Sequence, residues 1–125
     1  MILKTYARVV TDKLEETIVH LEALTGSVVE LQFTMGQVTI AAIGDFCVIA
    51  APASIHAELR AVVGPIVVDD LSITKDALLR MGGTVTAEPF TAPTGQVMYM
   101  RHPDGIAYEY LQYSFESTQL VGLSM

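Results

Sequence analysis

Hydrophobic and polar residues in the first half of the chain follow the pattern of one strand, one helix and three further strands. Residues 3–10 are rich in β-branched and aromatic side chains, as strands are. Four apolar residues then recur at helical spacing: Leu14, Ile18, Leu21 and Leu24. Gly26 follows this stripe and is expected to end the helix. Residues 28–34, 37–43 and 45–51 predict the three strands, with glycines in the turns between them.

The second half predicts the same elements in the same order. A strand is expected at residues 61–68 and a helix at 72–81, closed by Gly82 and Gly83. Three more strands are expected at residues 84–90, 97–102 and 106–112. We therefore divide the chain into module one at about residues 1–52, a linker at 53–60, module two at about 61–113 and a tail at 114–125.

The two modules are copies of one unit. Three pairs recur at an offset of 57 residues: Leu14 and Leu71, Gly26 and Gly83, Phe33 and Phe90. Two later pairs drift to offsets of 59 and 61 as the turns lengthen: Gln37 and Gln96, Gly44 and Gly105. A repeat unit of roughly 55–60 residues is too long for most solenoid proteins, and two copies are too few. The expected fold class is α+β, with two βαβββ modules forming one domain around a concave mixed sheet.

The composition and charge of the chain limit the classes of binding partner to be expected. The chain has 125 residues, of which 51% are hydrophobic, and a formal net charge of −7. Nucleic acids and anionic membranes bind basic surfaces, so neither is expected as a partner. No apolar run approaches the ~20 residues of a membrane span, and the N-terminus lacks a signal-peptide core. With the single cysteine Cys47 no internal disulfide can form, and a cytoplasmic protein is expected.

The most informative motif is a hairpin near the C-terminus. Pro103, Asp104 and Gly105 are turn residues between two strands. Glu109 follows four residues after the glycine, inside an apolar and aromatic run where an uncompensated charge is costly. This stretch resembles the last hairpin of the vicinal oxygen chelate superfamily, which includes glyoxalases, extradiol dioxygenases, and bleomycin- and fosfomycin-resistance proteins. The superfamily has two paired βαβββ modules, in agreement with the repeat.

The resemblance also implies four positions where the metalloenzymes of the superfamily carry His, Gln or Glu ligands. In this sequence these positions are Tyr6, Val48, Val63 and Glu109. Catalytic metal sites usually need about three protein ligands, so no metal and no cofactor are expected. The three histidines, His20, His56 and His102, are expected to be surface or packing residues.

Strand alternation predicts which side chains face the concave side of the expected sheet. Glu109, if it faces inward as in the superfamily, shares its face with Ala107 and Leu111, and Cys47 is expected to point away. The inward position of the first strand is Tyr6 or Thr5, depending on which residue is taken to open the following helix. We prefer Tyr6, because this alignment pairs Lys13 with Asp70 at the 57-residue offset. The expected ligand-binding residues are Tyr6, Arg8, Phe46, Tyr99, Arg101 and Glu109. The arginines and Glu109 either form a structural ion pair or hold a ligand, and no catalytic residue is assigned.

The expected function is that of a metal-free small-molecule-binding protein of the glyoxalase and bleomycin-resistance type, which sequesters an antibiotic or another organic ligand. The alternative is a non-hydrolytic isomerase or lyase that uses Glu109 as a general acid or base. A homodimer is expected because first-strand edges and an apolar tail need cover. The ligand's identity, and whether modules pair within or between chains, stay open.

Overall fold

Within residues 1–123, which the computed structural model describes, the chain forms nine strands, four α-helices and one short 3₁₀ helix. The strands are β1 (Ile2–Thr5), β2 (Ala7–Thr11), β3 (Leu31–Met35), β4 (Val38–Ile43), β5 (Phe46–Ala50), β6 (Val62–Val68), β7 (Thr84–Ala92), β8 (Gly95–Arg101) and β9 (Ala107–Tyr113). The helices are α1 (Leu14–Thr25), η1 (Ala53–Ile55), α2 (His56–Arg60), α3 (Leu71–Arg80) and α4 (Phe115–Leu120).

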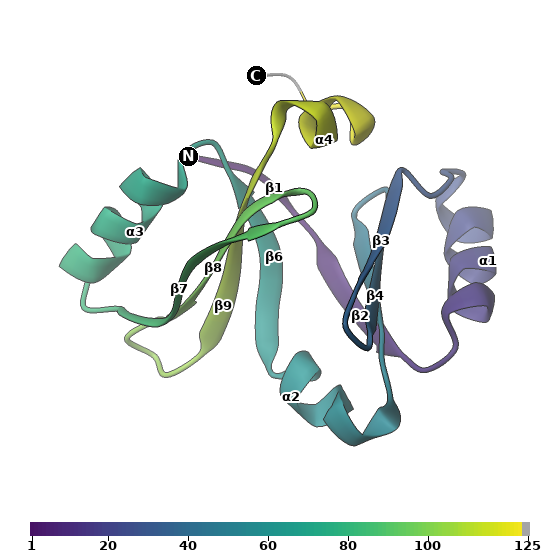
Figure 1. Ribbon diagram of the computed structural model, residues 1–125, viewed down its shortest axis with the longest axis horizontal. Coiled ribbons are helices and arrows are strands. Elements are labelled where there is room, and N and C mark those ends of the chain that lie inside the picture. Colours follow the sequence, from purple (N-terminus) through teal and green to yellow (C-terminus); the bar gives the residue numbers. More distant parts are fainter. Residues whose placement is uncertain (124–125) are drawn as a thin grey trace.

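The strands form two sheets that face each other, each built mainly from one module (Figure 1). The five-stranded sheet has the order β1-β6-β9-β8-β7, and the four-stranded sheet has the order β2-β5-β4-β3. In Figure 1, α3 and α1 lie on the outer sides, whereas α4 lies above and α2 below the space between the sheets. The α+β class and the two modules predicted from the repeat are confirmed.

Helix α1 begins and ends where the sequence indicates. The N–H of Gly26, at φ 71°, donates to the carbonyl of Glu22 at 3.0 Å, which is the left-handed helix end that glycine tolerates best. Most of the predicted stripe packs on the outer face of β4 and β5, in a cluster of Leu14, Ile18, Leu21, Ala41, Ile43 and Val48. Leu24 is the exception, because its side chain is exposed.

Helix α3 covers the other sheet in the same way. The carboxylate of Asp70 accepts a hydrogen bond from the N–H of Ile73 at 2.9 Å and caps the helix. The buried face of α3 packs on the outer face of β8 and β9, in a cluster of Leu71, Leu78, Met98, Met100 and Tyr110. Both sheets therefore bury their outer faces against a helix and turn their inner faces toward each other.

The first strand of module one is shared between the two sheets. β1 pairs antiparallel with β6, whereas β2 pairs parallel with β5. Tyr6 lies between β1 and β2, and its N–H donates to the carbonyl of Pro65 at 3.0 Å. This division gives nine strands where the sequence predicts eight. It also shows that the two modules pair within one chain.

The linker and the tail contain more structure than the sequence predicts. Residues 53–60 form η1 and α2, and residues 115–120 form α4. After α4, Val121 is buried with residues of both modules, and Leu123 packs against the same cluster. The last part of the predicted tail, residues 124–125, lies outside the described residues. Among the helices of residues 1–123, none has the length and apolar composition needed to cross a membrane.

Substitution of Gly95 tests the packing of the β8–β9 hairpin, which carries most of the inward-facing polar groups. Its φ is 154°, and a Cβ there would lie 2.1 Å from the carbonyl oxygen of Gln112 on β9. We expect Gly95→Ala to lower the free energy of unfolding by more than about 2 kcal/mol, measured by urea denaturation, because β8 and β9 must separate. Gly105→Ala is the control, since its φ is 87° with open space around the Cβ, and about 1 kcal/mol is expected. Equal losses for both variants would contradict the packing described here.

Candidate functional site

A cavity of about 230 Å³ lies between the inner faces of the two sheets. Its walls are mostly aliphatic and aromatic side chains from β3, β4, β5, β7, β8 and β9. Six residues with polar side chains also line it: Tyr6, Arg8, Thr94, Tyr99, Glu109 and Tyr113. Both modules contribute to this set, so the cavity exists only where the two copies meet.

Strand alternation explains how these side chains converge. Glu109, Leu111 and Tyr113 occupy every second position of β9, and all three line the cavity. Tyr99 pairs with Glu109 across the β8–β9 ladder, so their side chains lie on the same face. Arg8 reaches the same place from β2 of the other sheet.

Arg8 and Glu109 form a salt bridge between the modules. Nη2 of Arg8 donates to Oε1 of Glu109 at 2.5 Å, and the two side chains are only 8% and 14% exposed. Nε of Arg8 donates to the carbonyl of Gly64 at 2.9 Å, and Nη1 donates to the carbonyl of Leu59 at 3.0 Å. Each nitrogen of the guanidinium is therefore engaged with the protein, and the ion pair is held in a fixed geometry.

The environment of Glu109 changes its acidity. Burial raises the pKa of Glu109 above its ordinary value of 4.5, while the charge of Arg8 and the hydroxyl of Tyr99 lower it in part. Burial likewise raises the pKa of Tyr99 to about 12, with a further contribution from the Glu109 carboxylate. Tyr99 is thus a neutral hydrogen-bond donor at neutral pH.

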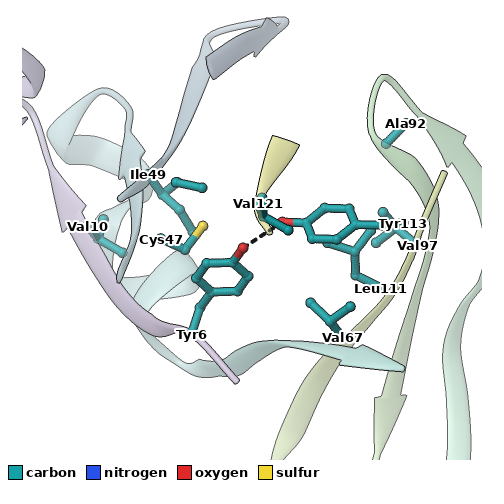
Figure 2. Close-up of a cluster of buried hydrophobic side chains, with 11 residues drawn as sticks. Tyr6, Val10, Cys47, Ile49, Val67, Ala92, Val97, Leu111, Tyr113 and Val121 are labelled. Carbon is teal, nitrogen blue, oxygen red and sulfur yellow. Dashed lines mark hydrogen bonds between the residues drawn. The ribbon is translucent and has the colours of Figure 1, made fainter. Parts of the chain in front are cut away.

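A second polar contact joins the modules at the cavity. The hydroxyl of Tyr113 donates to the hydroxyl of Tyr6 at 3.0 Å, and both residues are buried. Figure 2 shows the two rings approaching from opposite sheets, with Val121 beside their hydroxyls. Burial raises the pKa of Tyr6 to about 12 and also raises the pKa of Tyr113, so both phenols stay protonated.

Four of the six predicted site residues meet at this cavity: Tyr6, Arg8, Tyr99 and Glu109. The choice of Tyr6 over Thr5 as the inward residue is confirmed, because Thr5 is exposed. Of the two arginines, Arg8 forms an ion pair with Glu109.

The prediction for Phe46 is wrong. Cys47 and Ile49 line the cavity, whereas Val48 packs against α1 and Phe46 is half-buried away from the cavity lining. Glu109 lies four residues after Gly105, whereas the inward residue Cys47 lies three residues after Gly44, so the residue equivalent to Glu109 is Cys47, at an offset of 62. A shift of one residue moves every side chain of a strand to the opposite face.

The orientation predicted for Cys47 is wrong for the same reason, although its burial was expected. Burial raises the pKa of the Cys47 thiol to about 12, so the group is protonated and a weak nucleophile.

The prediction for Arg101 is also wrong. Arg101 is the last residue of β8, it is exposed, and its Nη1 donates to the carbonyl of Gly105 at 2.5 Å. Alternation places it on the inner face, but the cavity lies toward the other end of the hairpin. Its side chain therefore binds the turn instead of the site.

Tyr113 is the main functional residue that sequence reasoning missed. The predicted last strand ends at residue 112, one residue early, so it leaves out Tyr113. The alternation that runs from Glu109 through Leu111 reaches Tyr113 at the next inward position, so the signal was present. The carbonyls of Leu59 and Gly64 carry no such signal, because backbone acceptors depend on the path of the chain.

The described residues contain no group of three or more His, Cys, Asp or Glu side chains that could hold a metal ion. Each histidine has another position. His20 is exposed on α1, a ring nitrogen of His56 lies 2.8 Å from the carbonyl of Ala51, and the ring of His102 stacks on Tyr108 at 3.6 Å.

Known structures resemble this chain over most of its length. An uncharacterized protein from Methanosarcina mazei has a TM-score of 0.83 and 26% sequence identity, covering 91% of this chain and 94% of that chain. Methylmalonyl-CoA epimerase from Mycobacterium tuberculosis has a TM-score of 0.72 at 13% identity, covering 94% and 91%. Methylmalonyl-CoA epimerase from Streptomyces coelicolor, as a variant in complex with 2-nitronate-propionyl-CoA, has a TM-score of 0.67 at 14% identity, covering 90% and 96%. No family model and no curated protein matches the sequence. The likeness shows that the chain has the glyoxalase-like fold.

The salt bridge gives a prediction about pH. Because the pKa of Glu109 is raised on folding, its stabilising contribution is present below 4.5 and is lost as the pH rises through the folded value. Arg8 limits that rise, so in Arg8→Met the folded pKa moves further up. We expect Arg8→Met to lower the free energy of unfolding by about 3 kcal/mol near pH 8 and by much less near pH 5, measured by urea denaturation.

Two controls accompany this variant. Arg8→Met with Glu109→Gln removes the titrating group, so its loss should not depend on pH. Arg101→Met removes an exposed arginine and should change stability by under about 0.5 kcal/mol. A loss in Arg8→Met that is the same at both pH values would contradict the ion pair as described.

Proposed function

We propose that this protein binds a small organic molecule in the cavity between its two modules. The observation that carries the proposal is the cavity itself, in which an apolar lining surrounds a few polar groups that converge from both sheets. Sites for small molecules have this composition, because apolar walls supply affinity and a few fixed polar groups supply orientation.

The size of the cavity limits the ligand. A cavity of 150 Å³ holds benzene, so about 230 Å³ holds a molecule of about ten non-hydrogen atoms. Sequestration of an antibiotic, as the resemblance suggests, requires one that fits this space. Binding is proposed to be independent of metal, since the positions that correspond to the superfamily's ligands carry Tyr6, Cys47, Val63 and Glu109.

A second candidate is an isomerase or lyase with Glu109 as general base. Two observations favour it: burial raises the pKa of Glu109, and epimerases share the fold. The contacts of Glu109 favour binding instead, because its carboxylate is already paired with Arg8. Burial raises the pKa of Tyr6, Tyr99 and Tyr113, which makes these cavity residues weak acids. Exchange of a substrate C–H proton with deuterium, lost in Glu109→Gln, would support the enzyme.

Blocking the cavity tests the binding proposal. Ala42 is buried and lines the cavity, so Ala42→Leu places extra carbon atoms inside it. We expect compounds of about ten non-hydrogen atoms that bind the wild type, detected by NMR titration, to bind Ala42→Leu at least tenfold more weakly. The free energy of unfolding should change by less than about 1.5 kcal/mol, because existing space receives the side chain.

The matched control is Ala23→Leu, the same substitution at an exposed position of α1. This variant should bind the same compounds as the wild type does. Hits that bind Ala42→Leu unchanged, or a complete lack of hits with the wild type, would contradict the proposed site.

We also propose that the protein forms a homodimer. Val121 and Leu123 of the tail are covered within the chain, but Phe115 and Leu120 are 77% and 60% exposed on α4. Exposed apolar side chains of this size favour association. Light scattering at tens of micromolar should give twice the monomer mass, and Phe115→Ser with Leu120→Ser should give the monomer. A monomeric wild type would overturn this expectation.

A further inference from the structure

The charged groups at the cavity neutralise each other. Arg8 and Glu109 are the charged residues among the described residues that line it, and they form one ion pair. Lys4 lies outside the lining, 4.9 Å from the centre of the Tyr6 ring, and pairs with Asp45 at 2.8 Å. The remaining polar side chains of the lining are neutral hydroxyls and one thiol.

A charged ligand would meet no free counter-charge in this cavity. A carboxylate or phosphate would have to take Arg8 from Glu109, leaving a buried carboxylate without its partner, and an ammonium would have to take Glu109 from Arg8. Breaking a buried pair in this way is strongly unfavourable. The net charge of −7 adds a repulsion for anions.

The two tyrosine hydroxyls, in contrast, leave one donor available. Tyr6 and Tyr113 have two hydroxyl protons and share one hydrogen bond, which uses one proton. Within residues 1–123 no other hydrogen bond involves either hydroxyl, and both residues line the cavity. The second proton is free to bind an acceptor oxygen inside the cavity.

We propose that the ligand is an uncharged, mostly apolar molecule with one acceptor oxygen, such as a ketone, and that the Tyr6–Tyr113 pair donates a hydrogen bond to that oxygen. This inference rests on the proposed binding function and names the chemical class of its ligand. It separates this cavity from sites built for carboxylates or acyl-CoA esters, which must supply positive charge.

Three probes of nearly equal size test the ligand class. Acetophenone is neutral with a carbonyl acceptor, benzoate is an anion, and cumene is neutral without an acceptor. In NMR titrations at pH 7.5, we expect acetophenone to bind about fivefold more tightly than cumene, the usual net effect of one hydrogen bond. Benzoate should bind at least tenfold more weakly than acetophenone. Ala42→Leu should weaken every probe that binds.

The double variant Tyr6→Phe with Tyr113→Phe tests the donor. Removing both hydroxyls leaves neither one stranded, so the variant should fold. Acetophenone should then bind no more tightly than cumene does. Tyr108→Phe is the control, because Tyr108 packs on the outer side of the sheet, and it should keep the fivefold preference.

The outcomes separate the two proposals. Benzoate binding as tightly as acetophenone, in a way that Ala42→Leu blocks, would overturn the neutral ligand and leave the binding function intact. A preference for acetophenone that survives in the double variant would overturn the assigned donor. Failure of all three probes to bind the wild type would overturn both proposals.

Discussion

The rest of the structure depends on one buried ion pair at the boundary of the modules. Arg8 comes from the four-stranded sheet and Glu109 from the five-stranded sheet, so their bond holds the inner faces in a fixed relation. The carbonyls of Leu59 and Gly64 bind the same guanidinium, which ties the connection between modules to this point. Since either charge alone would be costly to bury, loss of one residue of the pair destabilises the fold.

The same pair shapes the chemistry of the cavity. A free arginine would make the cavity a receptor for anions, and a free glutamate with a raised pKa would make it a place for proton transfer. Together their charges cancel, and the uncharged polar groups left at the cavity are mainly the hydroxyls of Tyr6, Tyr99 and Tyr113. In the binding that we propose, the ion pair stabilises the fold and neighbouring phenols contact the ligand.

The fold could be predicted from the sequence because the internal repeat and the helical stripes indicate the same order of strands and helices in both modules. The sequence analysis correctly assigned Tyr6, Arg8, Tyr99 and Glu109 to the cavity. Alternation within a strand predicts the inward face reliably once one inward residue of that strand is known. Sequence reasoning misplaced Phe46 because that residue was reached by transfer through a turn whose length differs between modules. It misplaced Arg101 because alternation gives the face of a strand and not how far along the strand a cavity extends. The acceptors at Leu59 and Gly64 were out of reach, since a carbonyl has no sequence signature.

The repeat has a further consequence when the cavity is viewed as a pseudo-twofold arrangement. The 57-residue offset carries Arg8 onto Pro65, and the 62-residue offset carries Glu109 onto Cys47; both counterparts also line the cavity. The ion pair thus occurs once in the near-symmetric cavity, and the two equivalent positions carry the uncharged residues Pro65 and Cys47. A symmetric dimer of single modules could not achieve this, because each substitution would appear twice. Joining the copies in one chain allowed the two halves to diverge, so a single ion pair forms where a symmetric dimer would hold two or none.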